Sequence, residues 1–84
     1  MHFEFTENGW EDFQYWIDTD IVIVEKIKDL LNEIKRTPFQ GIGKPEPLKF
    51  ENSGYWSRRI NHEHRLVYKI ANETLYIALC RYHY

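Results

Sequence analysis

The N-terminal half of the chain places apolar side chains at the spacing of α-helices. Over Trp10–Ile17 they recur three to four positions apart, and an acid follows Asn8 by three positions, as in a capping box. This pattern predicts a helix from about Gly9 to Asp18. Before it, polar and apolar residues alternate over His2–Phe5, which is typical of a short strand.

A second helix is predicted to begin after Asp20, whose carboxylate suits an N-cap, and to end near Arg36, before Thr37-Pro38. Its apolar residues form one stripe at spacings of three to four: Ile21, Val24, Ile27, Leu31 and Ile34. Charged residues fill the gaps, so we expect this stripe to pack in the core, together with Trp10 and Trp16 of the first helix.

The C-terminal half changes character after residues 37–47, where three prolines and two glycines indicate a long loop. Four later segments are rich in aromatic and β-branched residues and are predicted strands: Leu48–Phe50, Tyr55–Ile60, Arg65–Ile70 and Thr74–Tyr82. The connections at 61–64 and 71–73 are short enough for hairpin turns, which favour antiparallel pairing.

The predicted fold class is α+β: a small antiparallel sheet (β-α-α-β-β-β) with two N-terminal helices packed on one face, in a single domain over residues 1–84. The other face of the sheet is expected to stay open. On the strand Arg65–Ile70, alternate residues beginning with Leu66 should pack on the helices. Arg65, Val67 and Lys69 should then lie on the open face.

Composition narrows the classes of protein that fit. The chain has 84 residues, of which 43% are hydrophobic, so it is sized for one packed domain rather than a repeat array or a disordered chain. Its one cysteine, Cys80, cannot form an intrachain disulfide and is expected to be a small buried apolar group in a reducing compartment. The longest apolar run, Leu75–Cys80, is far shorter than a membrane span, and residues 1–4 do not resemble a signal peptide. We therefore expect a cytoplasmic protein with no membrane association.

Charge is divided unevenly along the chain. Residues 1–40 carry nine acids and four bases, a net charge of −5, whereas residues 41–84 carry seven bases and four acids, a net charge of +3. A phosphate-binding site is therefore expected in the second half. The chain has no Walker motif, no paired cysteines for zinc and no nucleophile-elbow serine, so we expect no metal and no cofactor.

Several residues in the second half could carry chemistry. Glu46 lies between two prolines that restrict its backbone. Arg58 and Arg59 are adjacent on a predicted strand and should point to opposite faces, one lining the open face and the other pairing with an acid at the edge. Arg65 is expected on the open face, where its planar fork suits a phosphate.

His62 and His64 are two residues apart in a predicted turn. Two histidines without a third ligand nearby are a weak zinc signal, so we expect a turn exposed to solvent. His83 and Tyr84 follow directly on the last predicted strand, which could deliver them to the open face.

Four segments in order resemble one family along the whole chain: KPEPLK (44–49), SGYWSRRI (53–60), EHRLVY (63–68) and CRYHY (80–84). They resemble the YoeB toxins of YoeB–YefM toxin–antitoxin pairs, which belong to the RelE-like messenger-RNA interferases. The resemblance implies a small antiparallel sheet with two N-terminal helices, in agreement with the pattern above.

The resemblance also implies an activity, namely metal-independent cleavage of messenger RNA in the A site of the 30S ribosomal subunit. The family's catalytic residues correspond here to Glu46, Arg65, His83 and Tyr84. It further implies that Lys49 and Arg59 are suited to contacts with RNA phosphates. Arg58 and Lys44, from the same basic half of the chain, are expected to bind RNA as well. As partners the resemblance implies the ribosome, messenger RNA and a YefM-like antitoxin that neutralises the toxin. The toxin–antitoxin complex would bind its own operator DNA, and a homodimer is allowed.

These residues permit a reaction in which the RNA supplies its own nucleophile, the 2′-hydroxyl. Glu46, as a carboxylate, can take the 2′ proton, and Arg65 can only stabilise charge because it keeps its proton. His83 can protonate the leaving 5′-oxygen, and Tyr84 can stack on or orient a base.

Two rival functions stay open on the same scaffold. One is a toxin that only binds a protein target, as ParE-like toxins bind DNA gyrase, and the other is a ribonuclease that needs no ribosome. The presence of both Glu46 and His83 favours the nuclease over the gyrase inhibitor. The net charge of −2 is unusual for a protein that binds ribosomal RNA, and we attribute it to a helical half that faces away from the RNA.

Overall fold

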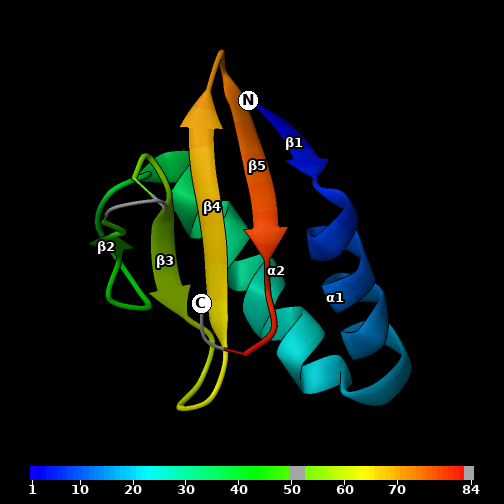
Figure 1. The fold of residues 1–84 in the computed structure, drawn as a ribbon. Helices are drawn as coiled ribbons and strands as arrows, with labels where there is room; N and C mark the ends of the chain where they lie inside the picture. The colour runs from blue at the N-terminus through cyan, green and yellow to red at the C-terminus, as the bar shows by residue number, and fades with distance from the viewer. Residues whose placement is uncertain (50–52, 83–84) are drawn as a thin grey trace.

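A computed structural model describes residues 1–49 and 53–82, which form two helices and five strands (Figure 1). In chain order these are β1 (His2–Phe5), α1 (Glu7–Thr19), α2 (Ile21–Arg36), β2 (Glu46–Pro47), β3 (Trp56–Arg59), β4 (Arg65–Ala71) and β5 (Thr74–Leu79). The predicted first strand and both predicted helices are confirmed. No helix in the described part of the chain is long and apolar enough to cross a membrane.

The strands form one sheet in the order β1-β5-β4-β3-β2. Neighbours from β5 to β2 are antiparallel, whereas β1 runs parallel to β5 at the edge. The α+β class is therefore confirmed, but the sheet is mixed rather than wholly antiparallel. A hairpin turn enforces antiparallel pairing, and no hairpin joins β1 to β5, so that constraint does not act on this pair.

The segment after the long loop departs from the prediction. Pairing with β3 occurs at Glu46–Pro47, before the predicted strand Leu48–Phe50, and Phe50 lies outside the described residues. Within the described chain four strands follow the helices, which equals the number of predicted segments and is one more than the order β-α-α-β-β-β contains.

The last strand also ends earlier than predicted, at Leu79. Beyond it the Cys80 backbone bonds to side chains of α1: its N–H donates to Asp12 Oδ2 at 3.0 Å, and its carbonyl accepts from Trp16 Nε1 at 2.8 Å. Helix α1 thus replaces a neighbouring strand as the partner of the chain that leaves β5.

The first helix begins two residues earlier than the sequence predicts, because Thr6 and not Asn8 is its N-cap. Thr6 Oγ1 accepts from the Gly9 N–H at 3.1 Å and donates to the Ile77 carbonyl at 3.2 Å. The same hydroxyl therefore caps α1 and attaches its start to β5. A Cβ at Gly9 would overlap the Ile77 carbonyl, so only glycine allows this close approach. The predicted cap at Asp20 is confirmed, with Oδ1 accepting from Val22 and Ile23.

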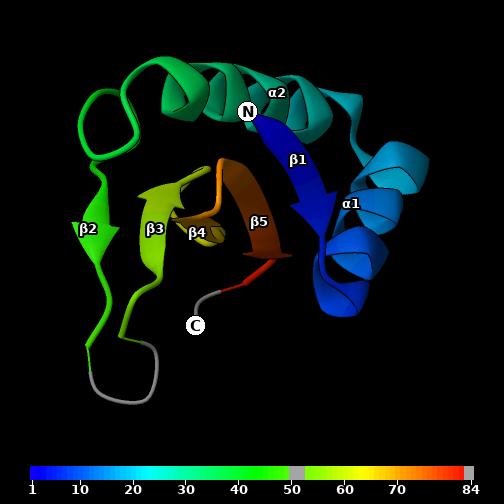
Figure 2. The same cartoon turned by 90° about the horizontal axis from the view of Figure 1, so that it is seen from above.

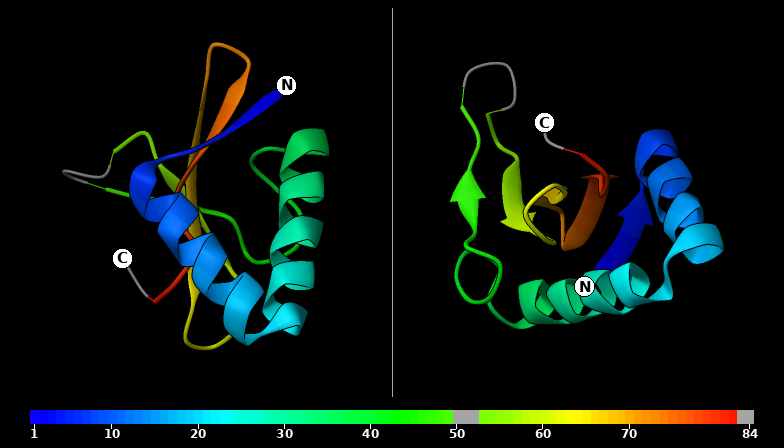
Figure 3. Two further views of the ribbon diagram at one scale, coloured as in Figure 1. Left: turned by 90° about the vertical axis from the view of Figure 1, so that its right-hand side faces the viewer. Right: turned by 90° about the horizontal axis from the view of Figure 1, so that it is seen from below.

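The core lies between one face of the sheet and the helices. Figure 2 shows α2 running along that face, with α1 at the β1 edge. Most of the predicted stripe is buried there, but Ile21 is 63% exposed, and Ile23 and Leu30 are buried instead. Trp16 is buried as predicted, whereas Trp10 is 46% exposed and packs against Phe5 at the rim. Among residues 1–49 and 53–82, no helix covers the opposite face of the sheet, which is flanked by β2 and α1 (Figure 3).

Candidate active site

The register of the strands places three of the predicted site residues on the open face. Leu66 and Tyr68 are fully buried against the helices, so Arg65, Val67 and Lys69 project from the other face, as predicted. Glu46 pairs with Ser57, which pairs with Val67, and one step further along Arg59 pairs with Arg65. Cross-strand partners project on the same side of a sheet, so Glu46, Arg59 and Arg65 all lie on the open face.

The separation of Glu46 and Arg65 follows from sheet geometry. Glu46 lies on β2 and Arg65 on β4, two strands away. Glu46 is level with Val67, and Arg65 is two residues before Val67, so the Cα atoms of Glu46 and Arg65 are about 12 Å apart. An arginine side chain covers roughly half of that distance. Among the described residues, the Glu46 carboxylate and the Arg65 guanidinium form no ion pair with each other, and a stretch of the open face lies between them.

Arg65 is fixed by its own end of β4. Its Nη1 donates to the carbonyls of Asn61 at 3.0 Å and His64 at 3.2 Å, and the side chain is half-buried. Its backbone N–H donates to the Tyr82 carbonyl at 3.0 Å. The chain beyond β5 thus returns to Arg65 at Tyr82. His83 and Tyr84, the next two residues, lie outside the described residues.

The predicted phosphate-binding residues do not form one group. Lys44 and Lys49 are exposed, and Lys44 has a left-handed backbone with φ of 52°. Arg59 is exposed too, and its N–H bonds to the Gly43 carbonyl at 2.6 Å, which ties the end of β3 to the loop before Glu46. Lys44, Arg59 and Lys26 of α2 line a common cavity of about 370 Å³.

Arg58 is not available to RNA, and its assignment as a phosphate contact is a correction. Its side chain is fully buried on the helix side, not paired with an acid at the edge. The guanidinium donates to the carbonyls of Thr37, Gln40 and Ile42 and to the Tyr68 hydroxyl, at 2.7 to 3.2 Å. It thereby fastens the loop that precedes Glu46 to the sheet.

We expect Arg58→Met to destabilise the fold by about 3 kcal/mol, because it leaves three carbonyls and a hydroxyl without a donor. Urea unfolding measures this loss. Arg36→Met, at an exposed position on the last turn of α2, is the matched control and should change stability by no more than about 0.5 kcal/mol. Equal stabilities for the two variants would show that Arg58 does not hold the loop.

Comparison with known proteins identifies the family of this chain. A family model described as the YoeB-like toxin of the bacterial type II toxin–antitoxin system matches residues 5–84. The chain is 55% identical to Toxin YoeB of Escherichia coli K12 over 84 residues, with 100% of both chains covered. This chain belongs to the YoeB-like toxins.

Solved structures of YoeB proteins have the same fold. The YoeB/ParE toxin from Agrobacterium tumefaciens superposes with a TM-score of 0.98 at 50% identity, covering 100% of both chains. A heterotetrameric YoeB–YefM toxin–antitoxin complex from Staphylococcus aureus contains a chain with a TM-score of 0.92 at 47% identity, covering 100% of this chain and 98% of that one. YafQ from E. coli, at 19% identity and a TM-score of 0.77, shares the fold alone.

Beside Glu46, Arg59 and Arg65, the open face of this YoeB-like toxin carries a group of aromatic side chains around Lys69 that the sequence analysis missed. Lys69 Nζ lies 5.1 Å from the ring centroid of Tyr55 and 5.6 Å from that of Tyr76. All three side chains project from the open face. Lys69 pairs with Tyr76 across β4 and β5, and Tyr55, the residue before Trp56, lies opposite Lys69 on the other side. A cavity of about 340 Å³ borders these side chains, and its lining includes Asn8, Leu48, Tyr55, Val67 and Leu79. The alternation along β5 could have predicted this group, because it places Tyr76 on the face of the sheet opposite to Leu75 and Ile77.

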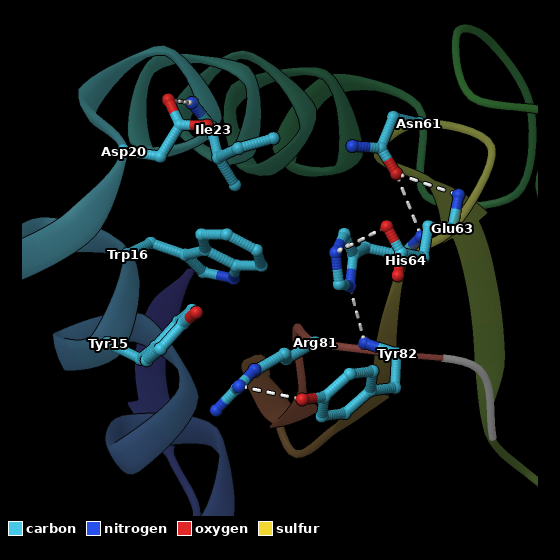
Figure 4. Close-up of a pocket in the computed structure, with 9 residues that line it drawn as sticks. All are labelled: Tyr15, Trp16, Asp20, Ile23, Asn61, Glu63, His64, Arg81 and Tyr82. Atoms are coloured by element: carbon cyan, nitrogen blue, oxygen red, sulfur yellow. Dashed lines mark hydrogen bonds and ion pairs between the residues drawn. The ribbon is translucent and has the colours of Figure 1, made fainter.

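The histidine pair is also placed differently from the prediction. His62 is exposed as expected, but His64 is 7% exposed and lines a cavity of about 350 Å³ between α1 and the end of the chain (Figure 4). In the described residues no group of three or more histidine, cysteine or carboxylate side chains could hold a metal ion.

Two buried titratable groups are inert at neutral pH. Burial, reinforced by the Asp12 carboxylate, raises the pKa of Cys80 to about 12, so the thiol stays protonated and acts as the small apolar group that was predicted. Burial also raises the pKa of Tyr68, against the opposing effect of Arg58. Its hydroxyl donates to the Pro38 carbonyl at 2.8 Å, so neither group serves the open face.

Proposed function

We propose that this YoeB-like toxin is a ribosome-dependent endoribonuclease that cleaves messenger RNA in the ribosomal A site. The observation that carries the proposal is the strand register, which puts Glu46, Arg59 and Arg65 on one open face. The chain also reaches Arg65 at Tyr82, one residue before His83. Action on ribosomes would make this a cytoplasmic activity.

The reaction requires a base, a positive charge and an acid around one phosphodiester. Glu46 takes the proton of the 2′-hydroxyl, and the 2′-oxygen attacks phosphorus. The bond from phosphorus to the 5′-oxygen breaks as His83 gives that oxygen a proton. The products are a 2′,3′-cyclic phosphate and a 5′-hydroxyl. The proposed reaction involves two proton transfers and requires no oxidant, reductant or metal ion.

Arg65 stabilises the charge that develops on the phosphorane. Its Nη1 is engaged with two backbone carbonyls, so the guanidinium is oriented before substrate arrives. Tyr84 stacks on or orients a base that leaves the RNA stack. Lys44, Lys49 and Arg59 are exposed cations on or beside this face and bind neighbouring phosphates.

The partner that controls this activity is a YefM-like antitoxin. The two solved Staphylococcus aureus YoeB–YefM complexes support this pairing, and a YoeB dimer from the same organism supports a homodimer. We expect an acidic, initially disordered antitoxin segment that folds over the open face and blocks the end of the chain. The complex of toxin and antitoxin, rather than the toxin alone, would bind the operator DNA.

A test of the proposed function compares purified toxin on naked messenger RNA and on the same RNA in programmed ribosomes. We expect cleavage on ribosomes alone, ending in a 2′,3′-cyclic phosphate, and its loss in Glu46→Gln. Glu73→Gln, at the exposed turn between β4 and β5, is the matched control and should cleave like the parent. Equal cleavage of naked RNA would replace the proposal with a ribosome-independent ribonuclease. No cleavage of either substrate would leave only a binding toxin.

A further inference from the structure

His64 is a buried histidine that the proposed reaction does not use. Its imidazole packs edge-on against Trp16, with ring centroids 4.7 Å apart, and lies beside the Tyr82 ring at 5.6 Å (Figure 4). The backbone N–H of His64 donates to Asn61 Oδ1 at 2.8 Å, which organises the turn before β4. The ring is therefore fixed by α1 on one side and by its own turn on the other.

Within the described part of the chain, the His64 ring makes one short hydrogen bond, and its partner is the backbone of Tyr82. The Tyr82 backbone N–H donates to His64 Nδ1 at 2.7 Å, and the Tyr82 carbonyl accepts from the Arg65 N–H at 3.0 Å. His64, the last residue of the turn, thus holds the Tyr82 N–H, and Arg65, the first residue of β4, holds the Tyr82 carbonyl. His64 also gives its carbonyl to Arg65 Nη1 at 3.2 Å, so it contacts both the guanidinium and the returning chain.

The backbone of Tyr82 needs such support. Its φ is 63°, a left-handed conformation that a residue with a Cβ adopts only at a cost in free energy. Two residues earlier, the backbone N–H and carbonyl of Cys80 are held by Asp12 and Trp16 of α1. Side chains, rather than a strand ladder, therefore guide the chain from β5 across to Arg65.

The side chain of Tyr82 is secured separately. Its hydroxyl accepts from Arg81 Nη2 at 2.7 Å, and the Arg81 guanidinium carbon lies 3.5 Å from the Tyr15 ring centroid. Loss of the His64 bond would therefore free the backbone N–H of Tyr82, while its carbonyl stays bonded to Arg65 and its hydroxyl to Arg81. This separation allows the role of the His64 ring to be tested by itself.

We propose that His64 is a positioning residue: its Nδ1 holds Tyr82 in the left-handed turn beside Arg65 and so fixes where the chain continues into His83. The proposal rests on the proposed function for its effect on cleavage. It requires neutral imidazole with the proton on Nε2, because only an unprotonated Nδ1 can accept the Tyr82 N–H. On the other side of the ring, Nε2 lies 3.6 Å from Glu63 Oε1, toward which that proton can point.

The test uses two variants that differ in the acceptor. In His64→Asn the amide oxygen can take the position of Nδ1, whereas His64→Phe keeps a ring against Trp16 and has no acceptor. We expect the Tyr82 amide to exchange with solvent roughly tenfold faster in the Phe variant, as followed by ¹⁵N NMR, and to stay protected in the Asn variant. This measurement needs no ribosome.

Cleavage is then measured in single turnovers on programmed ribosomes. The Phe variant should be slowed about 10²-fold with ribosome binding and melting temperature near those of the parent, and the Asn variant should recover most of the rate. If the Phe variant does not fold, His64→Gln, whose amide reaches the Nε2 position, takes its place with the same expectation. A parent-like rate without the acceptor, or an Asn variant as slow as Phe, overturns the positioning role. A parent that does not cleave refutes the proposed function instead, while amide protection still decides whether His64 holds Tyr82.

Discussion

Replacing Arg65 with lysine is expected to slow cleavage on programmed ribosomes by about 10²–10³-fold and to leave ribosome binding nearly unchanged. Lysine keeps the positive charge but loses the planar fork. In the parent, Nη1 is occupied by the carbonyls of Asn61 and His64, which orients the rest of the guanidinium. A lysine ammonium cannot bond to those carbonyls and offer two parallel donors to a phosphate. The contact should strengthen mainly as charge develops, so the loss belongs to the transition state.

Single-turnover cleavage at saturating toxin gives the rate, and a binding titration on the same ribosomes gives the affinity. Arg36→Lys makes the same chemical change at an exposed position of α2, remote from the open face, and should match the parent in both measurements. A lysine variant that cleaves as fast as the parent would show that Arg65 acts as a point charge. A loss confined to binding would place its role in docking.

Most of the fold was predictable because it depends on periodicity. The helical stripe over Ile21–Ile34 and the alternation over Arg65–Ile70 each fix which side of an element packs inward, and both are read directly from the sequence. The start of α1 was not predictable in the same way. Thr6 and Asn8 are both good caps, and the choice depends on Ile77, a residue far along the chain whose carbonyl bonds to the Thr6 hydroxyl.

The parallel pairing of β1 is a second feature that local pattern could not give. Its alternating residues indicate a strand, but they do not specify a partner or a direction. Strands that are adjacent in sequence pair through short turns, whereas β1 and β5 are separated in the chain by both helices and three other strands.

The sequence could predict which residues belong to the candidate site, but it could not predict how their side chains are arranged. The resemblance named Glu46, Arg59 and Arg65, and the strand register then placed them on one face. Alternation correctly put Arg58 and Arg59 on opposite faces, but it could not say that the buried one would be satisfied by three carbonyls of a loop. Arginine is rarely buried unless it is fully bonded, so composition favoured exposure.

His64 shows why a turn can be misjudged from sequence. A short polar segment, Asn61–His64, usually faces solvent. Here the Asn61 side chain accepts from two backbone N–H groups of the turn and directs His64 inward, onto Trp16. The contact joins α1 to β4, and no local pattern encodes a pairing over that separation.

The role of His83 as the general acid predicts a second large effect. Glutamine in its place keeps a polar side chain of similar reach but has no proton to transfer. We expect His83→Gln to bind programmed ribosomes normally and to cleave about 10²–10⁴-fold more slowly, because the 5′-oxygen of ribose leaves poorly without a proton. The rate is measured in single turnovers, with His2→Gln at an exposed position of the edge strand β1 as the matched control that should equal the parent.

A substrate with sulfur in place of the leaving 5′-oxygen separates this role from that of Glu46. A thiolate departs without protonation, so the defect of His83→Gln should nearly vanish on the sulfur substrate. Glu46→Gln should stay slow on both substrates, because a better leaving group does not remove the proton of the 2′-hydroxyl. A pH profile cannot make this distinction, since interacting groups titrate with values that belong to the pair. Equal defects of His83→Gln on oxygen and sulfur would reject the acid assignment. His83 would then act by stabilising charge or by orienting the RNA, and the acid would have to be another group near Arg65.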